Sequence, residues 1–198
     1  VVSGGVKITG WKKQGRMYVA DVPEFNGRPL EFRQLWVNGR KADRARDVAD
    51  FEKMYRIRNI DKKNEILYVP AAAVKKILGE RHAEMVIHEM WCVANLRIKG
   101  IKVQGDSAAV TFHQPESHIH FMHPWPSPMV TKDGHNSAFY LTNAKSLLDT
   151  PGEWYLDAKE QKVYYIPRKG EDMAKADVEA PAVETLMKIE GTPDAPVK

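Results

Sequence analysis

The chain has 198 residues, of which 43% are hydrophobic and 28% are charged, so it is long enough to bury a sizeable core. No stretch approaches the roughly 18 apolar residues of a membrane span, and we expect none. The net charge of +4 comes from 30 basic and 26 acidic residues that are interleaved along the chain. This pattern argues against a nucleic-acid partner, which favours a continuous basic stripe.

The N-terminal residues read "VVSGGVKITGW", without Met and without a signal peptide, which predicts a processed or excised piece of a longer protein. The single cysteine, Cys92, excludes an intrachain disulfide framework and a cysteine-based zinc knuckle. Because Cys92 lies in the apolar run "EMWCVANL", we expect an inert, buried thiol.

Short strands separated by turn residues dominate the first half of the chain. Residues 4–23 predict two strands split by Gly15, and residues 35–42 predict a hairpin around Asn38-Gly39, since both of these residues tolerate the positive φ of a type I′ turn. A short helix is possible over residues 47–57, followed by a strand over 64–70. Residues 70–78 have the strongest helical pattern, with proline in the first turn and Gly79 as the stop.

In the second half, residues 84–114 predict about three strands that are rich in Val and Ile. Residues 115–141 are rich in proline and predict a long, ordered loop, and residues 141–149 predict one or two helical turns. We therefore expect a mainly β fold, an antiparallel β-sandwich or irregular barrel with one or two short helices, as a single domain over residues 1–198.

The segment "PGEWYLDAKEQKVYYIP", residues 151–167, predicts a β-hairpin with a turn at "AKEQ". Side chains alternate along a strand, so Trp154 and Leu156 share one face while Tyr155 and Asp157 share the other. We expect the aromatic side chains to pack in the core, namely Trp154, Tyr155, Tyr164 and Tyr165. Glu153 and Asp157 then flank turns and do not form an acid/base pair.

Five of the seven histidines fall within residues 110–136. If this segment is extended, His118 and His120 share a strand face and could bind a metal with His123, His113 or Asp133 as the third ligand. No known metal-binding spacing occurs, however. We therefore expect no metal and no other cofactor, with the imidazoles bonded to the backbone.

A sugar-binding rim is a second use for this region. Sugars present apolar C–H faces ringed by hydroxyl groups, which suit an exposed Trp beside polar side chains. The candidate residues are Trp91, Trp125, His118, His120 and His123. Trp125 is the strongest candidate because prolines on both sides hold it in an extended loop.

No residue is predicted to be catalytic. The carboxylates that could act as a glycosidase pair are Glu116, Asp133, Glu153 and Asp157, and the distances between them decide whether they can act together. No G-x-S-x-G motif and no phosphate-binding glycine loop occurs.

Three runs carry a family resemblance: "FRQLWVNGRKADRAR" (residues 32–46), "NSAFYLTNAKSLLDTPGEWYLDAKEQKVYYIPRKGED" (136–172) and "VEAPAVETLMKIEG" (178–191). In this order they resemble the inserted region of secreted bacterial glycoside hydrolases built on a right-handed parallel β-helix, such as families 120 and 141. The resemblance implies a non-catalytic β-sandwich embedded in the β-helix of a polysaccharide-degrading enzyme. It also implies a location outside the cytoplasm, and a carbohydrate and the parent β-helix domain as partners.

In this family the catalytic carboxylates lie on later coils of the β-helix, so the resemblance carries no catalytic residue onto this chain. It implies that residues 1–10 leave the β-helix and residues 185–191 return to it, which would bring Val2 and Ile189 close together. Two alternatives stay open: a freestanding carbohydrate-binding module, and a small self-contained hydrolase that uses the histidine-rich segment.

Overall fold

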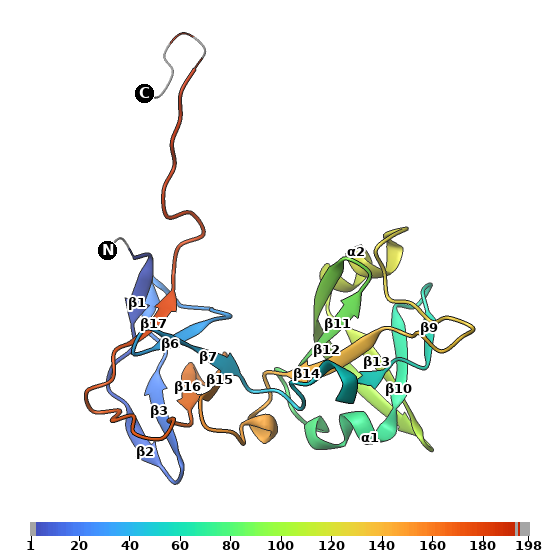
Figure 1. Ribbon diagram of the computed structural model, residues 1–198, viewed down its shortest axis with the longest axis horizontal. Coiled ribbons are helices and arrows are strands. Elements are labelled where there is room, and N and C mark those ends of the chain that lie inside the picture. Colours follow the sequence, from blue (N-terminus) through green and yellow to red (C-terminus); the bar gives the residue numbers. More distant parts are fainter. Residues whose placement is uncertain (1–2, 193, 195–198) are drawn as a thin grey trace.

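The computed structural model describes residues 3–192 and 194. Within this part of the chain the fold is mainly β, with an eight-stranded sheet, a seven-stranded sheet, a small two-stranded sheet and two short α-helices. Figure 1 shows the two large sheets as two neighbouring groups of strands. The predicted fold class, mainly β with one or two short helices, is confirmed.

The eight-stranded sheet is built from both ends of the chain. Its order is β1-β17-β6-β7-β15-β16-β3-β2. Neighbouring strands are antiparallel except β7 and β15, which run parallel. The bounds are β1 (Gly5–Lys7), β2 (Lys12–Gln14), β3 (Met17–Asp21), β6 (Leu35–Val37), β7 (Arg40–Arg44), β15 (Glu153–Asp157), β16 (Lys162–Tyr165) and β17 (Val178–Pro181).

The seven-stranded sheet comes from the middle of the chain and is antiparallel throughout, in the order β8-β14-β11-β12-β13-β10-β9. Its strands are β8 (Tyr55–Arg56), β9 (Asn59–Asp61), β10 (Ile66–Pro70), β11 (Glu84–Glu89), β12 (Cys92–Gln104), β13 (Ser107–Phe112) and β14 (Ala138–Thr142). The remaining elements are α1 (Ala71–Val74), α2 (Glu116–Met122), the β4 (Glu24–Phe25) and β5 (Arg28–Pro29) pair, and 3-10 turns at Phe51–Lys53, Lys75–Ile77 and Lys145–Leu147.

The β15–β16 hairpin forms the wall between two hydrophobic cores. Trp154 and Leu156 face the core of the eight-stranded sheet, whereas Tyr155 and Tyr164 face the core of the seven-stranded sheet. All four predicted core aromatics are buried, each exposing 9% or less of its surface. The predicted hairpin and its alternation of faces are therefore confirmed.

Two further local predictions are confirmed. Asn38 and Gly39 connect β6 and β7 with φ values of 51° and 71°, as a type I′ turn requires. The helix predicted over residues 70–78 consists of α1 followed by a 3-10 turn, and it ends at Gly79, whose φ is positive.

The long loop predicted over residues 115–141 is partly wrong, because α2 occupies its first part. Pro115 stands at the N-cap, directly before Glu116, whose acidic side chain in the first turn favours a helix start. Ser117 and Phe121 lie one turn apart and are buried. The buried residues of this segment therefore recur with the period of a helix, near 3.6 residues, whereas the prediction for the histidines assumed the period of two of a strand.

The first and last strands of the described residues, β1 and β17, pair with each other. In β1 and β17, Gly5 lies opposite Pro181, and the N–H of Ala182 donates to the carbonyl of Gly4 at 2.9 Å. Val2 lies outside the described residues, so its expected proximity to Ile189 stays a prediction. No strand occurs over residues 185–191, and no helix of the described residues is long and apolar enough to cross a membrane.

Candidate functional site

The hairpin of β11 and β12 presents an exposed tryptophan at its tip. Met90 and Trp91 form the turn between Glu89 and Cys92, which are paired across the hairpin. Trp91 is 77% exposed and has a φ of 65°, in the left-handed region that bulky residues rarely adopt. Such a conformation costs on the order of 1–3 kcal/mol and is concentrated at functional positions.

A second tryptophan contacts the first from another element. Trp125 follows the end of α2, is 44% exposed, and its ring lies edge-on to that of Trp91 with the centroids 3.7 Å apart. The Nδ1 atom of His123 accepts a hydrogen bond from the backbone N–H of Trp125 at 3.2 Å. The structure thus brings together three of the five predicted sugar-rim residues in an exposed aromatic edge.

His120 lies beside this edge and faces Glu89. Its Nδ1 atom is 3.5 Å from Oε2 of Glu89, whose side chain is fully buried. Burial raises the pKa of Glu89, and the neighbouring His120 acts in the opposite direction. Burial and the Glu89 carboxylate raise the pKa of the Cys92 thiol. Cys92 is partly exposed, so the expectation of a buried thiol is wrong.

His118 does not join the site. Its Nδ1 atom lies 2.9 Å from Oε1 of Glu65, in the turn before β10. Hydrogen bonds from Ser117 and His118 lower the pKa of Glu65. Residues two apart on a helix point about 200° away from each other, because a turn takes 3.6 residues. The expectation that His118 and His120 share one face is therefore wrong.

The other ligands considered for a metal lie elsewhere. His113 lines a cavity of about 390 Å³ together with residues from both sheets. Asp133 is exposed and lies 3.9 Å from Nε2 of His135. Within residues 3–192 and 194, the one group of three potential ligand residues in mutual reach is Glu89, Cys92 and His120.

The carboxylates of the β15–β16 hairpin organise turns. Oε2 of Glu153 accepts hydrogen bonds from the backbone N–H groups of Asp149 and Thr150 at 3.2 and 3.1 Å. Oδ1 of Asp157 accepts from two backbone N–H groups in the 158–161 turn. The prediction that Glu153 and Asp157 flank turns is confirmed.

The cavity of about 390 Å³ lies where the two sheets meet and is lined by several basic side chains. Glu84, at the start of β11, is 5% exposed and is paired with two of them, Arg33 and Arg44. Asn143 also accepts a hydrogen bond from Nε of Arg44 at 3.2 Å. This network connects residues of both sheets and explains the buried charges without a ligand.

Sequence reasoning did not consider Glu89, and it expected Cys92 to be an inert thiol. Both stand at a hairpin turn that carries neither Asn-Gly nor another turn dipeptide, so the turn itself gave no signal. The Glu-x-x-Cys spacing is the one cue that the sequence offered. Their neighbour His120 was named as a candidate ligand, but the direction of its side chain could not be predicted without knowing that residues 116–122 form a helix.

Comparison with known proteins gives two matches. A family profile described as "GH141 insertion domain" matches residues 15–168. A solved structure named "Glycoside hydrolase" is 64% identical to the chain, with a TM-score of 0.93. The similarity covers 98% of this chain and 34% of that one, so the chain spans only part of that protein's length. No curated protein matches the chain.

Proposed function

The chain belongs to the GH141 insertion domain family, and from this premise we propose that it is a non-catalytic accessory domain that shapes or covers the sugar cleft of a larger glycoside hydrolase. The observation that carries the proposal is the exposed Trp91–Trp125 edge. Its rings are suited to the apolar faces of a sugar, and the strained backbone of Trp91 indicates a position held for a purpose other than packing.

The pairing of β1 with β17 supports an inserted domain, because a domain inserted in a loop leaves and rejoins its host at neighbouring points. The outgoing segment exposes three apolar side chains, Leu186, Met187 and Ile189, by 54%, 68% and 69%. Apolar side chains exposed to this extent suit burial against another surface. We propose that this surface is the parent's core, a right-handed parallel β-helix, with residues 1–10 and 185–191 as its exit and return segments.

The arrangement in Figure 1 supports a role at the parent's cleft. The outgoing segment after β17 and the helix α2 both lie towards the upper edge of the molecule in that view. Trp125 follows α2 in the chain, and its ring contacts that of Trp91. A domain attached at β1 and β17 can in this way hold the two rings over an adjoining surface.

The contacts of the acidic side chains support the proposal that this domain does not catalyse glycoside hydrolysis. Glycoside hydrolysis needs two carboxyl groups about 5–9.5 Å apart across the scissile bond. Glu153 and Asp157 bind backbone N–H groups, and Glu116 is paired with Arg97. We propose that catalysis belongs to other parts of a secreted bacterial parent and that the sugar is bound jointly.

The basic residues support a chain without a nucleic-acid partner. Arg44 is mostly buried against Glu84, Arg46 pairs with Asp43, and Arg58 pairs with Asp106. Three of the eight basic residues in the densest basic stretches, residues 40–47 and 54–65, are thus engaged with acidic groups of the same chain, which reduces the free positive surface for phosphates.

The test measures the parent enzyme on polymeric and on small substrates. We expect Trp91→Ala and Trp125→Ala to raise KM for a polysaccharide about 5–30-fold each, which corresponds to about 1–2 kcal/mol of lost ring contact, and to leave kcat unchanged. KM for a small aryl glycoside should not change, because such a substrate does not reach the rim. Val103→Ala, which truncates an apolar side chain that is 44% exposed near the other end of β12, is the control.

Two results would overturn the proposal. The first is a polysaccharide KM within twofold of the unmutated enzyme in both variants. The second is robust turnover of aryl glycosides by the 198-residue chain alone, abolished by Glu153→Gln without loss of folding, which would favour the self-contained hydrolase.

A further inference from the structure

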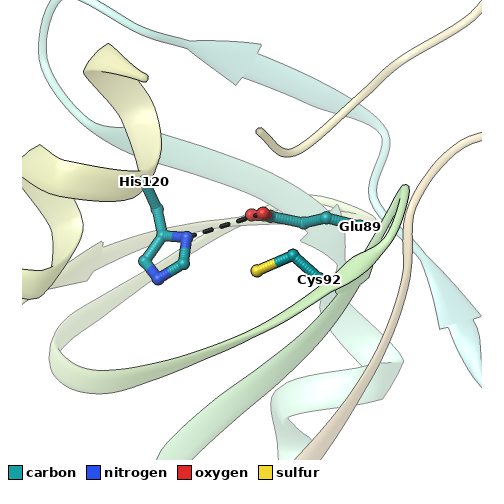
Figure 2. A group of neighbouring side chains, drawn as sticks. All are labelled: Glu89, Cys92 and His120. Carbon is teal, nitrogen blue, oxygen red and sulfur yellow. Dashed lines mark ion pairs between the residues drawn. The ribbon is translucent and has the colours of Figure 1, made fainter. Parts of the chain in front are cut away.

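Three different ligand types meet in the crease between the β11–β12 hairpin and α2. Glu89 is the last residue of β11, Cys92 is the first residue of β12, and His120 lies on α2. Figure 2 shows the three side chains pointing towards one another, with the Glu89 carboxylate opposite the His120 ring. One oxygen, one sulfur and one nitrogen atom lie within 4.8 Å of each other.

The buried carboxylate of Glu89 has one charged contact, His120, and no hydrogen-bond partner among the described residues. The residue is 8% exposed, and neither Oε1 nor Oε2 has a hydrogen-bond partner within the described residues. Burying a carboxylate costs several kcal/mol unless it is paired or bound to a metal. Nδ1 of His120 lies 3.5 Å from Oε2 of Glu89, at ion-pair distance, and leaves Oε1 without a partner among the described residues.

We propose that Glu89, Cys92 and His120 bind a divalent transition metal ion, and that zinc is the ion this ligand set fits best. Zinc accepts thiolate, imidazole and carboxylate ligands together, whereas calcium and magnesium require oxygen ligands. Tetrahedral zinc with bonds of about 2.0–2.3 Å places its ligand atoms roughly 3.3–3.8 Å apart. Ligand atoms that all lie within 4.8 Å of one another therefore reach this spacing with small side-chain movements. Three protein ligands leave a fourth position for water.

The ion would fasten α2 to the hairpin. Trp91 lies between two of the ligands in the sequence, and Trp125 follows the helix that carries the third. A metal at this point would link the hairpin that carries Trp91 to the helix that precedes Trp125. The inference does not depend on the proposed sugar contact, because metal binding is measured without any saccharide.

The sequence-based expectation of no metal considered the histidine-rich segment alone. Two of the three ligands come from outside that segment. The helix directs His120 towards Glu89, whereas His118 contacts Glu65. Binding releases the thiol proton of Cys92 to the solvent, so the affinity should fall as the pH is lowered.

The experiment starts from the 198-residue chain stripped with a chelator. Titration with Zn²⁺ should show one site, and titration with Co²⁺ should produce a thiolate-to-metal absorption band in the near ultraviolet. Cys92→Ser should abolish this band. Glu89→Gln and His120→Ala should each weaken Zn²⁺ binding at least about tenfold, since even outer-shell changes cost about 10–100-fold. Added Zn²⁺ should raise Tm in the unmutated chain and not in Cys92→Ser.

His118→Ala is the matched control, since it removes a histidine from the same helix but from the face towards Glu65, and it should bind Zn²⁺ like the unmutated chain. The Co²⁺ band of the unmutated chain is a test that needs no variant and no assumption about folding. The proposal is overturned if that band is absent at saturating Co²⁺, or if Cys92→Ser binds Zn²⁺ with unchanged affinity.

Discussion

Replacing Glu84 by Gln should destabilise the protein by about 3 kcal/mol. The Glu84 carboxylate is 5% exposed, and it is paired with Arg33 and Arg44, whose Nη1 lies 2.8 Å from Oε2. The Arg44 side chain is only 14% exposed, so removing the carboxylate leaves a buried cation without its charge partner. Breaking a buried pair in this way costs about 3–5 kcal/mol.

Two features reduce this cost towards its lower limit. The side chain of Arg33 is 52% exposed, so its share of the pair is worth no more than about 1 kcal/mol. Asn143 continues to accept from Nε of Arg44, and the amide oxygen of the new Gln can still accept one hydrogen bond. Against a typical stability of roughly 5–15 kcal/mol, the variant should still fold.

The assay is urea unfolding followed by tryptophan fluorescence, with the m value checked for constancy. Glu24→Gln, at an exposed position on β4, is the control and should stay within about 0.5 kcal/mol of the unmutated protein. Adding Arg44→Met to Glu84→Gln should recover much of the loss, because the unpaired cation is then removed. A loss below about 0.5 kcal/mol in Glu84→Gln would refute the reasoning.

Three further changes test other parts of the fold. Arg97 lowers the pKa of Glu116 from 4.5 to about 2, so this pair stabilises the folded state above pH 4.5 and the effect is lost as the pH falls towards 2. Arg97→Gln should therefore lower the free energy of unfolding by about 1 kcal/mol at neutral pH, a small value because Arg97 is exposed, and should have no effect near pH 2. The measurement is urea unfolding at both pH values, and an equal loss at both would contradict this explanation. Gly152→Ala should lower the stability measured by thermal unfolding by about 1–3 kcal/mol, because Gly152 has a φ of 93° and a new Cβ would lie 2.8 Å from Nε of Arg168. Adding Arg168→Ala should remove the steric contact but not the backbone strain. No loss of stability in Gly152→Ala would argue against this turn geometry. Trp154→Ala, at a fully buried ring, should cost about 3–5 kcal/mol by urea unfolding, and a cost below about 1 kcal/mol would mean that the core collapses around it.

Local patterns predicted the local structure well. Asn38-Gly39 and the alternation of Trp154 and Tyr155 each depend on a few neighbouring residues, and both were confirmed. The prediction that His118 and His120 share one face was wrong, because the pattern of a short segment fits a helix and a strand equally until its tertiary contacts are known. The strained turn at Trp91 had no signal, since a bulky residue at positive φ contradicts the usual preference.

The order of strands could not be predicted for a different reason. β17 inserts between β1 and β6, and β15 runs parallel to β7, so both pairings join segments more than 100 residues apart in the chain. Such pairings depend on the final packing of the two cores and leave no trace in neighbouring residues. The site depended on the same packing, because α2 and the hairpin tip meet only in the folded sheet.

The division of the eight-stranded sheet between the two ends of the chain has a consequence during synthesis. β8 to β14 can pair with one another as soon as they have left the ribosome, whereas β1, β2, β3, β6 and β7 must wait for β15 to β17 to complete their sheet. Until then β1, β3, β6 and β7 each lack a permanent neighbour, and unpaired edges of this kind attract other chains. The seven-stranded sheet is therefore the half expected to fold early, and the half that carries the attachment points closes last, when β17 arrives to join the first strand of the domain.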